Sequence, residues 1–199
     1  MPVTINGTTG IVTPAENTTA LTVGSITGIL KATSGVVSQA TAGSDYGQLT
    51  LATAQNASGT AVDFTGIPSW VKRITVMFSA VSTNGSSIPM IQIGSGSVTS
   101  TGYESQGWTS NTNNTSNTTG FIIGGISFAS YVYDGIAVLT LLNATSNLWV
   151  ISVNGAGLST GAFVAGGNKT LSGTLDRVRI TTVNGIDTFD AGTINISYE

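Results

Sequence analysis

One stretch of the sequence combines aromatic rings with side-chain amides in a way that suits sugar binding. The polar insertion "TSNTNNTSNTTG", residues 109–120, is preceded and followed by aromatic residues. Exposed Trp and Tyr rings stack on sugar faces, and Asn side chains hydrogen-bond to hydroxyl groups. We therefore predict that the insertion lies on the surface and carries a receptor-binding site; the alternative is a hairpin tip with the aromatic rings buried in the core. The candidate residues are Tyr103, Trp108, Asn111, Asn113, Asn114, Tyr131 and Tyr133.

The residue types that most hydrolases need are missing. Without His or Cys, the chain cannot build a Ser-His-Asp triad, a Cys-His pair or a His-ligated zinc site. Paired carboxylates remain, and the closest pair near a loop is Asp187 and Asp190 in "DTFDAG". Such a pair could serve a glycosidase or hold calcium, but Asp side chains also accept backbone N–H bonds in turns, and we favour the turn. We predict that the protein is not an enzyme and has no cofactor and no metal site.

Charge and hydropathy narrow the range of partners. The net charge is −3, and the six basic residues are scattered along the chain. They form no stripe that could follow a phosphate backbone, so we expect no nucleic-acid partner. The longest apolar run, "FIIGGISFA", is too short and too rich in glycine to span a bilayer, so we expect no membrane insertion.

Most of the chain after residue 47 alternates in the way that β-strands do. In "KRITVMFSA", Ile74, Val76, Phe78 and Ala80 share one face. The same period of two appears in three later segments. These segments are residues 136–142, 149–153 and 194–198.

Asn-Gly pairs predict where the strands turn. They occur at residues 84–85, 154–155 and 184–185, and the last pair joins "DRVRITTV" to "IDTFDAGTINISY". Such pairs favour the positive φ angles of tight hairpins. Strands and turns together predict an all-β protein whose residues 48–199 form an antiparallel β-sandwich of jelly-roll type.

Residues 1–47 form a segment of a different kind. It contains no aromatic residue before Tyr46 and few charged residues. Aromatic side chains contribute most to core burial, so this segment cannot build a stable core alone. We predict an extended shaft in which several copies intertwine, or a segment that docks on a larger assembly.

Three segments resemble a known family. "GILKATSGVVSQATAGSDYG" is similar to the shaft-to-head connector of bacteriophage tail fibre proteins. "GIPSWVKRITVMFSAVSTNG" and "TLSGTLDRVRITTVNGIDTFDAGTINISYE" resemble the C-terminal receptor-binding-type domain of such fibres. The resemblance implies a homotrimeric component of the phage particle, made in the bacterial host cytoplasm. Its segment 1–47 would attach to tail, baseplate or capsid proteins, and its head, residues 48–199, would be distal.

The function expected from these observations is adsorption of a tailed phage to its host. The receptor would be a cell-surface glycan or protein, with polysaccharide favoured, and the 109–120 insertion would point away from the shaft. Two alternatives remain: a capsid decoration or head-fibre protein built on the same trimer, and a glycan depolymerase that uses an acid pair.

Overall fold

A computed structural model of the chain describes residues 28–34, 36–41, 44–110, 114–157 and 159–199. The chain divides into two units, Met1–Tyr46 and Gly47–Glu199, beside the predicted boundary at residue 47. Every regular element in the described residues is a β-strand, and every pair of strands is antiparallel, which confirms the all-β prediction. These residues include no helix with the length and apolar composition that crossing a membrane requires.

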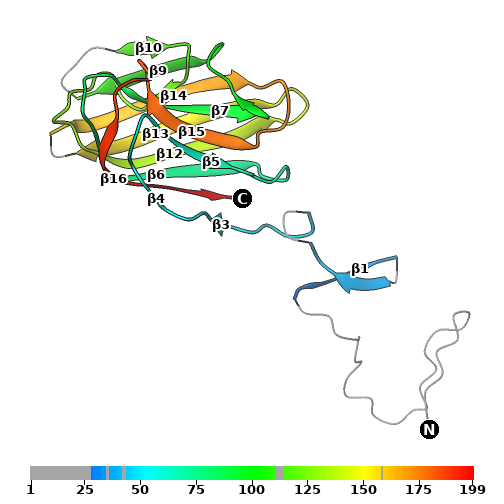
Figure 1. The fold of residues 1–199 in the computed structure, drawn as a ribbon. Helices are drawn as coiled ribbons and strands as arrows, with labels where there is room; N and C mark the ends of the chain where they lie inside the picture. The colour runs from blue at the N-terminus through cyan, green and yellow to red at the C-terminus, as the bar shows by residue number, and fades with distance from the viewer. Residues whose placement is uncertain (1–27, 35, 42–43, 111–113, 158) are drawn as a thin grey trace, which may run out of the picture. The chain divides into compact units, whose positions relative to one another are not determined.

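The larger sheet of the second unit has nine strands, which Figure 1 labels. Neighbours follow the order β10-β9-β14-β13-β12-β6-β16-β3, and β4 also pairs with β16. The strands are β3 (Thr50–Leu51), β4 (Gln55–Asn56), β6 (Arg73–Thr83), β9 (Glu104–Thr109), β10 (Thr115–Asn117), β12 (Tyr133–Asn143), β13 (Leu148–Gly157), β14 (Gly161–Thr170) and β16 (Phe189–Tyr198). The chain therefore begins this unit at one edge of the sheet, β3, and forms the opposite edge with β10.

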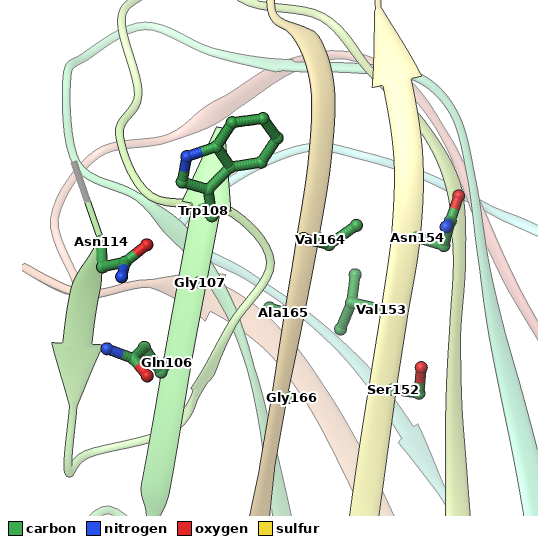
Figure 2. Close-up of a pocket in the computed structure, with 10 residues that line it drawn as sticks. All are labelled: Gln106, Gly107, Trp108, Asn114, Ser152, Val153, Asn154, Val164, Ala165 and Gly166. Atoms are coloured by element: carbon green, nitrogen blue, oxygen red, sulfur yellow. The ribbon is translucent and has the colours of Figure 1, made fainter. Parts of the chain in front are cut away.

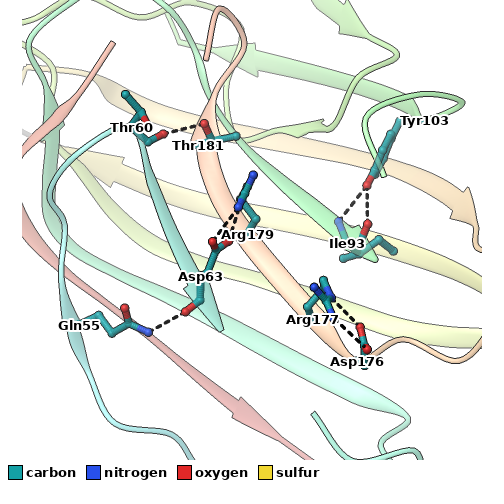
Figure 3. A network of polar contacts seen from close by, with 9 residues as sticks. All are labelled: Gln55, Thr60, Asp63, Ile93, Tyr103, Asp176, Arg177, Arg179 and Thr181. Atoms are coloured by element: carbon teal, nitrogen blue, oxygen red, sulfur yellow. Dashed lines mark hydrogen bonds and ion pairs between the residues drawn. The ribbon is translucent and has the colours of Figure 1, made fainter. Parts of the chain in front are cut away.

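The smaller sheet has five strands in the order β11-β7-β15-β5, with β8 also paired to β7. They are β5 (Ala61–Thr65), β7 (Pro89–Ser95), β8 (Ser97–Val98), β11 (Phe121–Ile122) and β15 (Arg177–Thr182). Two ion pairs lie along this sheet in the described residues (Figure 3). Arg179 donates two hydrogen bonds of 2.7 Å to the Asp63 carboxylate, and Arg177 pairs with Asp176 at 2.8 Å. One continuous apolar core, with members from both sheets, joins them as a sandwich.

Alternation along β6 gives the predicted inward face as far as Phe78. Ile74, Val76 and Phe78 are buried, but Ala80 is exposed and Val81 takes the next core position. The reason is a β-bulge: Ala80 has a φ of 53°, and the Asp134 carboxylate accepts its N–H at 2.7 Å. The additional residue reverses which side chains face the core beyond that point.

None of the three Asn-Gly pairs forms the predicted hairpin. Residues 84–85 and 184–185 each join strands of different sheets, β6 to β7 and β15 to β16. Asn154 and Gly155 lie inside β13, which is paired on both sides. A Cβ atom at Gly155 would overlap the Phe163 ring and the Asp134 carbonyl, so this glycine serves close packing and not a turn. The jelly-roll connectivity stays a prediction.

The described part of the first unit contains an antiparallel hairpin of β1 (Leu30–Thr33) and β2 (Val36–Gln39). After it, Asp45 accepts the N–H of Thr41 at 2.7 Å and pairs with Lys31 at 2.8 Å. These two contacts hold the pKa of Asp45 below its usual range, the Lys31 hydrogen bond being the larger cause. The apolar side chains of this hairpin remain in water within a single chain. They are Ile29, Leu30, Val36 and Val37.

Candidate functional site

A hollow of about 420 Å³ lies on the outer face of the larger sheet, near its β10 edge (Figure 2). Strands β9, β14 and β13 form it, and the residue just before β10 closes one side. We call it the Trp108 hollow. Its outward side chains are those of Gln106, Trp108, Asn114, Ser152, Asn154 and Val164.

Strand register brings these residues together from distant parts of the sequence. Trp108 of β9 pairs with Val164 of β14, which pairs with Asn154 of β13. The next outward row is Gln106, Gly166 and Ser152 in the same three strands. Because side chains on one face of a sheet repeat every second residue, these two rows are direct neighbours on the outer face.

Gly166 supplies the open centre of the hollow. It lies between the side chains of Gln106 and Ser152 and has none of its own (Figure 2). A Cβ atom built there would meet only the Ile151 carbonyl, at 3.5 Å, which is an ordinary contact. The glycine is therefore not needed for packing, and its effect is to leave the space above the sheet empty.

The chemistry of the Trp108 hollow is neutral and amphipathic. Trp108 is 39% exposed, so part of its indole ring is available for stacking. Gln106, Asn114 and Asn154 are exposed and offer amide donors and acceptors. Of the described residues, none that lines the hollow is ionisable. An aromatic plate beside amides and a hydroxyl suits a polyhydroxylated, uncharged ligand.

Tyr103 and Tyr133, two of the predicted contact residues, are buried and cannot be exposed stacking plates. Tyr103 is 1% exposed, and its hydroxyl accepts the N–H of Ile93 at 2.8 Å (Figure 3). The hydroxyl also lies 2.9 Å from the Thr99 carbonyl. Tyr133 is 0% exposed and its hydroxyl donates to the Ile126 carbonyl. Burial raises the pKa of each tyrosine to about 12. For these two residues, the alternative that the rings are buried in the core is correct.

The remaining candidates divide three ways. Trp108 and Asn114 line the Trp108 hollow together. Tyr131 is half-buried and packs edge-on against the exposed Phe128, with ring centroids 5.1 Å apart, and it does not line the hollow. Asn111 and Asn113 lie outside the described residues. Within the 109–120 insertion, residues 115–117 form strand β10, which pairs with β9.

Sequence reasoning missed the part of the site that β13 and β14 contribute. Ser152 stands between Ile151 and Val153 in the alternating segment, so its outward direction was already implied. Nothing in the sequence showed that it would lie beside Gly166 and Gln106, because that depends on the register of three strands.

Asp187 lies in the connection between β15 and β16, as the favoured turn predicted, whereas Asp190 lies within strand β16. Asp187 accepts the N–H of Ser87 at 2.8 Å and the side-chain amide of Asn184 at 2.8 Å, and these bonds hold its pKa below the usual range, the Asn184 bond being the larger cause. A general acid of a glycosidase needs the opposite shift. Asp190 accepts a hydrogen bond from Ser82. Within the described residues no group of three or more acidic, His or Cys side chains could hold a metal ion.

Comparisons with protein-family models, with curated proteins and with solved structures find no match to this chain.

Proposed function

We propose that the protein is a non-enzymatic, glycan-binding fibre of a tailed bacteriophage, in which the β-sandwich adsorbs to a host-surface polysaccharide. The observation that carries the proposal is the Trp108 hollow: an exposed indole beside uncharged amide side chains, above a strand position that has no side chain. Shallow sites of this composition bind sugars through ring stacking and hydroxyl hydrogen bonds.

The position of the hollow in its sheet supports a role in attachment. It lies by the β10 edge, and the strand that follows the N-terminal unit, β3, lies at the other edge. With strands roughly 4.8 Å apart, the four to six strand spacings from β3 to the strands that form the hollow correspond to about 19 to 29 Å. A receptor site far from the point where the chain joins its attachment segment is what a fibre head requires.

The first unit supports the homotrimer. A two-stranded hairpin is at best marginally stable in water, and this one exposes Ile29, Leu30, Val36 and Val37. Copies of the chain that wrap together would bury these side chains in a shared core. Several heads on one fibre would then raise avidity by about 10² to 10⁴ over a single weak site.

Binding to purified bacterial surface polysaccharides tests the proposal. Trp108→Ala should lose about 1 to 3 kcal/mol of binding free energy per site. Gly166→Val should also abolish binding, because the new side chain would project into the hollow, and its Cβ atom would make only an ordinary 3.5 Å contact with the Ile151 carbonyl. Both variants should unfold at the temperature of the unmodified protein. If both bind polysaccharide as the unmodified protein does, the hollow is not the receptor site.

A further inference from the structure

A second hollow of about 420 Å³ adjoins the Trp108 hollow on the same face. It lies over the start of β9, the end of β14 and strand β10, and Glu104, Ser116 and Asn168 line it. Gln106 lines both hollows. Because they share this outward side chain, the two hollows form one open groove along β9.

The groove has a defined length and direction. Glu104, Gln106 and Trp108 alternate outward along β9, at positions that the burial pattern leaves exposed. The four residue steps from Glu104 to Trp108 correspond to roughly 13 Å of strand. One sugar ring does not reach from one end to the other, whereas a short run of linked rings does. Opposite β9, the floor is Asn168, Gly166 and Val164 of β14.

The charge of the groove lies at the end remote from Trp108. Among the described residues that line either hollow, Glu104 is the ionisable one besides the buried Tyr103. Asn168 donates to its Oε2 atom at 2.7 Å, which orients the carboxylate and leaves Oε1 to accept from a ligand. Lys169 does not offset this charge from within the groove, because its Nζ atom is turned to the Thr101 carbonyl and the Tyr103 ring.

We propose that this groove binds an internal stretch of a linear, uncharged polysaccharide. One sugar ring stacks on Trp108, the chain passes over Gly166, and hydroxyl groups of a further ring donate to Glu104. A carboxylate accepts hydroxyl hydrogen bonds strongly and repels anions, so acidic glycans that contain uronic acids bind less well. The inference rests on the proposed function and adds the ligand class and its direction along β9.

The first test uses the full chain and a panel of purified bacterial surface polysaccharides, some uncharged and some containing uronic acids. The best-binding polysaccharide is then cut into oligosaccharides of increasing length. We expect an uncharged polysaccharide to bind best, with affinity that rises beyond a disaccharide before it levels off. A monosaccharide that binds as tightly as the longer oligosaccharides would overturn the groove.

The second test uses Glu104→Ala and Glu104→Gln, with Thr140→Ala as a control on the exposed face of β12. Glu104→Ala should weaken binding of the longer oligosaccharides about tenfold, the effect of losing one charge-assisted hydrogen bond. It should leave the disaccharide that stacks on Trp108 unaffected. Glu104→Gln should reduce the preference for uncharged over acidic polysaccharides, most clearly at low salt, and the control should match the unmodified chain.

The outcomes separate the two proposals. Binding that depends on Trp108 but is unchanged in both Glu104 variants overturns the groove and leaves the proposed function standing. Absence of binding to every polysaccharide overturns both. Tighter binding of acidic than of uncharged polysaccharides overturns the assigned ligand class alone.

Discussion

Tyr103→Phe should destabilise the sandwich without reducing its affinity for polysaccharide. The hydroxyl accepts the N–H of Ile93 at 2.8 Å inside the core, and the phenylalanine ring cannot replace it. The carbonyl of Ile93 keeps a second donor, the N–H of Thr99, and the Thr99 carbonyl, which also loses the hydroxyl, belongs to a half-buried residue. The fully buried group left without this partner is therefore the N–H of Ile93. An unpaired buried donor costs about 1 to 3 kcal/mol. For a domain of this size, each kcal/mol lowers Tm by about 2 to 4 °C, so a 2 kcal/mol loss lowers it by about 4 to 8 °C.

The assay compares Tyr103→Phe with Trp108→Ala, because the two residues have opposite expected roles. Thermal unfolding by circular dichroism measures stability, and polysaccharide binding is measured well below either Tm. Tyr103→Phe should lose stability and keep its affinity, while Trp108→Ala should keep its stability and lose affinity. If Tyr103→Phe instead melts with the unmodified protein and binds polysaccharide weakly, the ring faces the ligand and the burial argument is refuted.

The other predictions concern pH, close packing and assembly. Burial raises the pKa of Tyr103 and Tyr133 to about 12, above the value near 10 of an unfolded tyrosine. Their contribution to the free energy of unfolding should therefore be complete below pH 10. It should fall between pH 10 and 12, by up to about 1.4 kcal/mol per pH unit for each tyrosine. A free energy of unfolding in urea that does not change over this pH range would contradict the prediction. Gly167→Ala should lower Tm and Gly166→Ala should not, because a Cβ atom at Gly167 would overlap the Glu104 carbonyl, whereas one at Gly166 makes an ordinary 3.5 Å contact with the Ile151 carbonyl; equal melting curves would contradict this difference in packing. The fragment 47–199 should fold alone, as measured by circular dichroism, and light scattering should give a trimer for the full chain; an unfolded fragment or a monomeric full chain would contradict the corresponding prediction.

Strand positions were predictable where the side chains of a strand alternate between the core and solvent. In β13, Trp149, Ile151 and Val153 are buried and Ser152 is exposed, as alternation predicts. The pattern failed at Ala80, where a bulge moves the inward face by one residue. A bulge of this kind depends on a side chain from another strand, Asp134, which local alternation does not reveal.

The turns were not predictable from Asn-Gly pairs, because glycine meets two different needs. A tight hairpin needs its positive φ, whereas a crowded sheet needs its missing side chain. Gly185 has a φ of 69° but joins two sheets, and Gly155 lies in mid-strand under the Phe163 ring. Local sequence gives the same signal in both cases.

The candidate site was predictable only where one segment supplies it. Trp108 and Asn114 are close in sequence and line the same hollow. Tyr103 belongs to the same segment, but its hydroxyl hydrogen-bonds to the backbone of Ile93 inside the core. The opposite wall, with Ser152 and Asn154, comes from β13, and its placement depends on a register that local sequence does not specify.

Two adjacent glycines in β14 show how one strand can serve both the fold and the site. Gly167 faces inward, where a Cβ atom would overlap the Glu104 carbonyl, so the pairing of β14 with β9 needs a glycine there. Gly166 faces outward with an ordinary contact at 3.5 Å, so packing would accept a larger residue. Glycine in the middle of a strand weakens the strand, and at Gly166 no close packing contact requires a glycine. The open space between Trp108 and Glu104 is therefore the feature that this glycine preserves, and that space is where the proposed glycan would lie.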